Sequence, residues 1–206
     1  MIIMRYSFFL VILLILSYHT AFTQKFKGGM QAGFTASQIA GDGISGFNKA
    51  GFQVGFFASY PLRSTFSLQM ELAFIQKGSA QAENPEIGMT QYLRRLSYVE
   101  WPLLLQYQLQ KLIAEAGVSA DFLTYSFEER DFQQIDQSIA DPWRKLSFNT
   151  VIGVRYKLYN RLWVTMRSIN SINSIRKGSV PLNVKRYGQK FGEFNDVLLF
   201  GLAIQY

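Results

Sequence analysis

The chain ends in the stretch FNDVLLFGLAIQY, residues 194–206, in which large apolar residues recur at every second position. Successive side chains of a β-strand point to opposite sides, so Leu198, Phe200, Leu202, Ile204 and Tyr206 share one face. The intervening residues are mostly smaller or more polar. An aromatic residue that closes an amphipathic strand is typical of transmembrane β-barrels, where aromatic side chains lie at the membrane interface. The stretch therefore predicts the last strand of a small membrane barrel.

Seven further segments show the same alternation, at about the 9–11 residues that a tilted membrane strand requires. The predicted strands are 28–39, 50–60, 66–77, 96–109, 112–127, 146–158, 162–175 and the C-terminal strand. Tight turns and long polar loops alternate between them, as in outer-membrane barrels. We therefore predict an all-β fold, an eight-stranded antiparallel up-and-down transmembrane β-barrel. The connection order places both termini on the short-turn side, the periplasm.

The first 23 residues form a separate unit. Arg5 precedes an apolar run over residues 8–16, and small residues flank Phe22 at the end of the unit. These features predict a cleavable signal peptide over residues 1–23 and a barrel domain over residues 24–206. The apolar run is shorter than the roughly 20 residues of a membrane-spanning helix. An exported barrel of this kind belongs in the outer membrane of a Gram-negative bacterium.

Four tyrosines support this topology. Tyr60, Tyr107, Tyr156 and Tyr206 all lie at short-turn ends, with the parity of the apolar faces. Such a row is expected at a membrane–water interface. Trp163 lies at the same level with the opposite parity, so it either fills the lumen or marks a register shift.

The opposite parity directs polar side chains into the barrel. The predicted inward set is Gln53, Gln69, Glu71, Glu100, Gln106, Glu115, Asp121, Asn149, Arg155, Lys157 and Arg167. Acids and bases are mixed, and eight strands leave room for side chains and little else, so we expect a packed polar lumen. We hypothesise a structural charge network in which Arg155 and Arg167 bridge four acids. The acids are Glu71, Glu100, Glu115 and Asp121.

The residue types argue against an enzyme. There is no cysteine, and the single histidine, His19, lies in the predicted signal peptide. Histidine-dependent hydrolysis and histidine or thiolate metal sites are therefore not expected. Residues 41–46 match the letters G-x-G-x-x-G of a dinucleotide-binding motif, but the strand–helix context of that motif is missing. We therefore expect these glycines to form a turn in a polar loop. We expect no catalytic, metal-binding or cofactor-binding residues and no cofactor.

The last long loop is a candidate contact surface. It carries five bases, Arg176, Lys177, Lys185, Arg186 and Lys190, whereas the preceding long loop is acidic. At the cell surface such a loop could hold lipopolysaccharide phosphates or an acidic envelope protein. The alternative is a solvated loop that contacts nothing. The formal net charge is +7, but no basic stripe indicates nucleic-acid binding, so outer-membrane lipid is the expected partner.

The pattern resembles the PorT-like outer-membrane β-barrel proteins of Bacteroidetes. The similarity includes GGMQAGFTASQI after the signal, FSLQMELAFIQKGS, SYVEWPLLLQYQL and the terminal FGLAIQY. The family's fourth-strand signature corresponds here to Tyr98, Glu100, Pro102 and the leucines at 103–105. The resemblance implies a link to secretion or envelope assembly. Pro102 inside a strand predicts a bulge or a locally unpaired position.

These observations favour a non-enzymatic barrel that serves as a structural or accessory component of the envelope. One alternative is a narrow porin-like channel for ions or small solutes, which conductance would reveal. Another is a soluble lipocalin-like binding barrel, which would place the apolar faces inside.

Overall fold

The computed structural model describes residues 26–83, 91–135, 142–177, 184–186 and 188–206. The predicted signal peptide lies outside the described residues. Among the described residues, no helix is long and apolar enough to cross a membrane.

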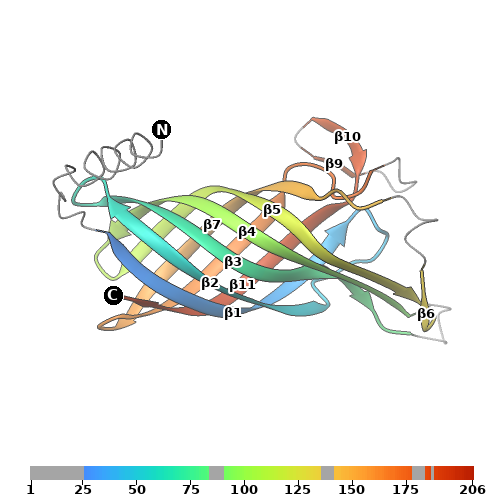
Figure 1. Ribbon diagram of the computed structural model, residues 1–206, viewed down its shortest axis with the longest axis horizontal. Coiled ribbons are helices and arrows are strands. Elements are labelled where there is room, and N and C mark those ends of the chain that lie inside the picture. Colours follow the sequence, from blue (N-terminus) through green and yellow to red (C-terminus); the bar gives the residue numbers. More distant parts are fainter. Residues whose placement is uncertain (1–25, 84–90, 136–141, 178–183, 187) are drawn as a thin grey trace, which may run out of the picture.

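Eight long strands form a closed antiparallel ring (Figure 1). Consecutive strands of the ring pair with each other, and the first pairs with the last, so none has a free edge. The ring consists of β1 (Lys27–Ala40), β2 (Lys49–Pro61), β3 (Phe66–Gln81), β4 (Tyr92–Leu109), β5 (Leu112–Arg130), β7 (Leu146–Tyr159), β8 (Leu162–Ser171) and β11 (Phe194–Gln205). Three short strands lie outside it: β6 (Gln133–Gln134) pairs with β5, while β9 (Val184–Arg186) and β10 (Gln189–Gly192) pair with each other. The predicted fold is confirmed.

The two faces of the wall follow the predicted parity. Apolar side chains of every ring strand point outward, with Phe34 80% exposed and Phe56 and Ile152 each 66% exposed. The inward positions are buried, as Gln53 and Glu100 illustrate. An apolar outer surface suits contact with lipid, whereas a soluble binding barrel would have the reverse arrangement.

The strands are longer than predicted at the loop end. β3 continues to Gln81, β4 begins at Tyr92 and β5 continues to Arg130, so this part of the wall projects beyond the rest (Figure 1). By contrast, β8 ends at Ser171 rather than at residue 175. The chain then turns back, and a single bridge joins Trp143 to Arg176.

Pro102 marks an interruption between β3 and β4. Met70 is paired with Leu103 and Ala73 with Glu100, but the positions between them are unpaired. Proline has no N–H to donate, which explains the local loss of the ladder. The register with β3 is the same on both sides, so Pro102 is locally unpaired toward β3 and is not a bulge. Toward β5 it is paired with Ser119.

Candidate functional site

The lumen is the candidate site, because the inward parity gathers most buried polar side chains there. All the predicted inward residues except Lys157 are buried; Lys157, at the mouth, is half-buried. They come from all eight ring strands once Gln31 of β1 and Asn195 of β11, which the sequence analysis did not include, are counted.

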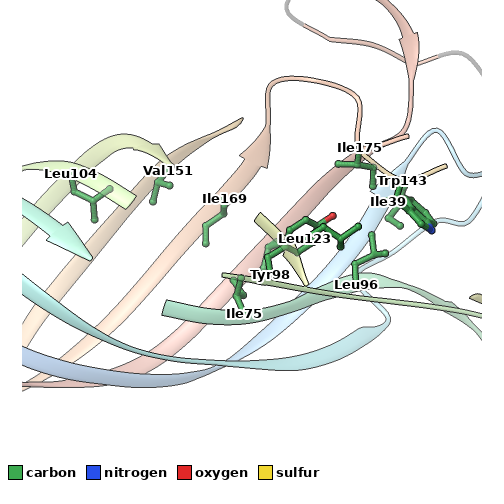
Figure 2. Close-up of a cluster of buried hydrophobic side chains, with 11 residues drawn as sticks. Ile39, Ile75, Leu96, Tyr98, Leu104, Leu123, Trp143, Val151, Ile169 and Ile175 are labelled. Carbon is green, nitrogen blue, oxygen red and sulfur yellow. The ribbon is translucent and has the colours of Figure 1, made fainter. Parts of the chain in front are cut away.

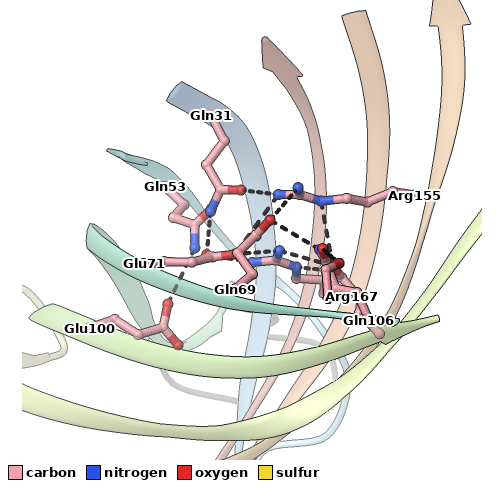
Figure 3. A network of polar contacts seen from close by, with 10 residues as sticks. Gln31, Gln53, Gln69, Glu71, Glu100, Gln106, Arg155 and Arg167 are labelled. Atoms are coloured by element: carbon pink, nitrogen blue, oxygen red, sulfur yellow. Dashed lines mark hydrogen bonds and ion pairs between the residues drawn. The ribbon is translucent and has the colours of Figure 1, made fainter. Parts of the chain in front are cut away.

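Arg167 of β8 is the centre of one charge network (Figure 3). Its two terminal nitrogens donate to the two oxygens of Glu71 at 2.8 and 2.7 Å. Its Nε donates to Glu115 Oε1 at 2.5 Å. A two-pronged guanidinium–carboxylate pair is among the stronger hydrogen-bonded contacts in proteins. The guanidinium therefore joins β3, β5 and β8 across the lumen.

Arg155 of β7 lies against the same two acids at longer distances. Its Nε is 3.4 Å from Glu115 Oε2, and one terminal nitrogen is 3.8 Å from Glu71 Oε1. Its terminal nitrogens donate to Gln69 Oε1 at 3.0 Å and to Gln31 Oε1 at 2.7 Å. Amide side chains thus accept from both terminal nitrogens of this second arginine, whereas its buried Nε has no hydrogen-bond partner among the described residues (Figure 3).

The other two acids of the hypothesised network have a different partner. Lys77 Nζ lies 2.5 Å from Asp121 Oδ2 and 3.7 Å from Glu100 Oε1, and its side chain is buried. The hypothesis that the arginines bridge Glu100 and Asp121 is therefore wrong for these two residues. Lys77 has the inward parity of β3, but it stood at the predicted end of the strand and was not included.

Apolar side chains fill the lumen on both sides of these networks, which corrects the expectation of a wholly polar interior. Toward the short turns, one cluster contains Phe57, Ile113, Trp163 and Ala203. Trp163 is 5% exposed and opposite Lys157, so it fills the lumen. A larger cluster (Figure 2) extends from Leu104, which is paired with Gln69, to Trp143 and Ile175 near the loops. It comprises Ile39, Ile75, Leu96, Tyr98, Leu104, Leu123, Trp143, Val151, Ile169, Ile175 and Val197. Apolar side chains fill space without needing hydrogen-bond partners, and several of these share the inward parity.

A ring of four charges closes the loop end. Arg94 donates to Glu128 and Glu193, at 3.0 Å in both cases. Arg176 contacts the same two acids, with Glu128 at 2.7 Å and Glu193 at 3.1 Å. Each arginine therefore bridges both glutamates. We call Arg94, Glu128, Arg176 and Glu193 the outer cap.

An aromatic ring supports the outer cap. The guanidinium carbon of Arg176 lies 3.9 Å from the centroid of the Trp143 ring, and that of Arg94 lies 5.7 Å away. Burial acts to raise the pKa of Glu128, but a hydrogen bond from Tyr92 and the charges of Arg94 and Arg176 outweigh it. The pKa of Glu128 therefore lies below its ordinary value. The carboxylate is held ionised as part of the cap.

The five bases of the predicted contact loop lie in different environments. Arg176 belongs to the outer cap and is buried. Arg186 forms a two-pronged contact with Asp196, at 2.6 and 2.9 Å. Lys177 and Lys185 are exposed, and the side chain of Lys190 lies outside the described part of the structure. Two of the five bases are therefore already matched by acids of the barrel.

Comparison with known proteins agrees with this architecture. The family model described as "Outer membrane protein beta-barrel domain" matches residues 20–177. Neisserial surface protein A is similar at a TM-score of 0.51 and 10% identity, covering 88% of this chain and 97% of that one. Ail, the attachment invasion locus protein of Yersinia pestis, has a TM-score of 0.49 and 11% identity, covering 87% of this chain and 98% of that one. The identities are low, so the likeness to the neisserial protein concerns the fold alone. No curated protein sequence matches the chain.

Proposed function

The chain belongs to the outer membrane protein beta-barrel domain family, and on this premise we propose that it is a non-enzymatic, non-conducting component of the envelope. The observation that carries the proposal is the filled lumen. Two charge networks, two apolar clusters and the outer cap together occupy the barrel interior. This filling of the described lumen argues against a path for solutes, and it supports a role in which the outer wall and the loops make contacts.

The proposal includes the orientation and the subgroup. We place both termini in the periplasm. The position of the C-terminus at the tight-turn end (Figure 1), opposite the long loops, supports this orientation. The exposed Tyr60, Tyr107, Tyr156 and Tyr206 lie at that same end, as expected for an interfacial row. The fourth-strand residues Tyr98, Glu100 and Pro102 support membership of the PorT-like group of Bacteroidetes, and with it a role in secretion or envelope assembly.

Purification from native outer membranes tests the role as an accessory component. The tagged protein is extracted in mild detergent and whatever co-elutes is quantified by mass spectrometry. A second tagged barrel from the same membrane serves as the control. We expect one envelope protein at a fixed ratio with this chain and not with the control. Recovery of a clean monomer, or of the same proteins in both samples, would contradict an accessory role.

A further inference from the structure

The tight-turn end of the barrel contains a cavity of about 330 Å³. Trp163 and Ile113, from the apolar cluster below it, contribute to its lining. Amide and hydroxyl side chains, among them Gln106, Gln205 and Ser59, line the walls. A volume in this range is that of a small-molecule site. We call it the mouth cavity.

Exposed or half-buried basic side chains line the mouth cavity. Lys27, Arg63, Lys157 and Arg161 are among its lining residues, and no aspartate or glutamate is. Two of them contact aromatic rings: Lys157 Nζ lies 5.8 Å from the centroid of the Trp163 ring, and the guanidinium carbon of Arg161 lies 5.5 Å from that of the Tyr206 ring. Across the described residues, none of the four forms an ion pair within 4.0 Å of a carboxylate.

Elsewhere in the barrel, several basic side chains are paired with acids. In the lumen and outer cap, five bases each have a carboxylate within 4.0 Å: Lys77, Arg94, Arg155, Arg167 and Arg176. Like charges gathered around a cavity repel one another, and an anion within it relieves that repulsion. In the described part of the chain, no aspartate or glutamate lines the mouth cavity, whereas each of these five bases has a carboxylate partner.

From these observations we infer that the mouth cavity binds a phosphate-bearing ligand. Arginine forks and lysine ammonium groups are the usual protein donors to phosphate oxygens, and the amides and hydroxyls of the wall add further hydrogen bonds. Tyr206 lies on the rim, at the level of the interfacial tyrosines. The phosphate belongs either to a phospholipid headgroup or to a soluble phosphate ester. The lipid source rests on the proposed periplasmic orientation, whereas binding itself does not.

Calorimetric titration with glycerol 3-phosphate tests the site in the detergent-solubilised full chain. The test variant combines Arg63→Gln and Lys157→Gln. The control combines Lys111→Gln and Lys177→Gln, which removes the same charge at bases that do not line the mouth cavity. Barrel formation of both is checked by their shifted mobility on unheated gels. We expect the test variant to bind at least tenfold more weakly, and the control to bind within twofold of the wild type.

A second arm identifies the source of the phosphate. The same three proteins are released from nanodiscs containing phosphatidylglycerol, and the retained lipid is counted by native mass spectrometry. Retention by the wild type and control but not by the test variant assigns a lipid headgroup. Binding of glycerol 3-phosphate without such retention assigns a soluble ester. The inference is overturned if the wild type binds neither probe, or if both variants behave alike. Conductance of the barrel does not affect this result.

Discussion

Arg167 joins three strands of the barrel across the lumen through its contacts with Glu71 and Glu115. It is 1% exposed and contacts Glu71 and Glu115 at hydrogen-bond distance. Removing it leaves two buried carboxylates short of their principal partner. Loss of one partner of a buried ion pair typically costs about 3–5 kcal/mol, most of it from the charge that remains.

We therefore predict that Arg167→Leu lowers the free energy of unfolding by about 3–5 kcal/mol. Urea titration of the barrel in lipid vesicles measures the change. Arg161→Leu removes a base of the mouth that has no ion pair in the described structure, and it should change stability by less than about 1 kcal/mol. Equal stability of wild type and Arg167→Leu would refute the network.

The outer cap leads to a prediction about local stability at low pH. The pKa of Glu128 is lowered in the folded protein, so its stabilising contribution is complete above the unfolded value of about 4.3 and is lost as the pH falls through the folded value. Tyr92, Arg94 and Arg176 face this carboxylate. The N–H groups of Arg144 and Ile175 donate to Ile175 O and Glu193 O, next to the cap. Their hydrogen-exchange protection factors, which correct for the intrinsic pH dependence of exchange, should therefore fall below about pH 4.

Glu128→Gln should lower these protection factors at neutral pH and remove much of their further loss in acid. Glu129→Gln changes the neighbouring residue, which is not in the cap, and should behave like the wild type. If Glu128→Gln kept the wild-type exchange profile, the cap would not depend on this carboxylate.

At the scale of elements, barrel closure depends on the seam between β1 and β11. Gly33 and Gly201 are paired across it. A Cβ on Gly33 would lie 2.6 Å from Phe200 O and 2.8 Å from the Cα of Gly201, so backbone would have to move. A side chain here forces the two strands apart.

We predict that Gly33→Val destabilises the barrel by about 1–3 kcal/mol, the usual cost of overpacking. Gly28→Ala on the same strand is the control, since its Cβ would meet only Phe57 O, at 3.9 Å. Unfolding in urea and the fraction of folded barrel on unheated gels measure both. A loss for Gly28→Ala equal to that for Gly33→Val would show that the seam is not specially tight.

The elements also show how far the sequence could predict the structure. Alternation of apolar and polar residues located all eight ring strands, because one face of each contacts lipid. It failed at the loop ends of β3, β4 and β5, where polar residues such as Ser79 and Arg95 occupy strand beyond the apolar band. Parity alone could have placed Lys77 and Ile75 in the lumen. The pairing of Arg176 with Glu128 joins segments 48 positions apart, and no local pattern indicates it.

For the whole molecule, the order of layers along the barrel axis is the main finding. The mouth cavity and the smaller apolar cluster lie at the tight-turn end, the charge networks and the larger apolar cluster occupy the lumen, and the outer cap lies at the loop end. Eight-stranded barrels have an interior just wide enough for side chains to fill, and here those side chains are matched in charge over most of its length.

The most direct test of this account is single-channel recording of the purified wild-type barrel in planar lipid bilayers. A porin inserted under the same conditions shows that channels would be detected. Because the lumen is filled, we predict no stable conductance steps from this protein. Reproducible steps at low voltage, present in every preparation of folded barrel and absent from unfolded protein, would contradict a closed lumen and favour a channel.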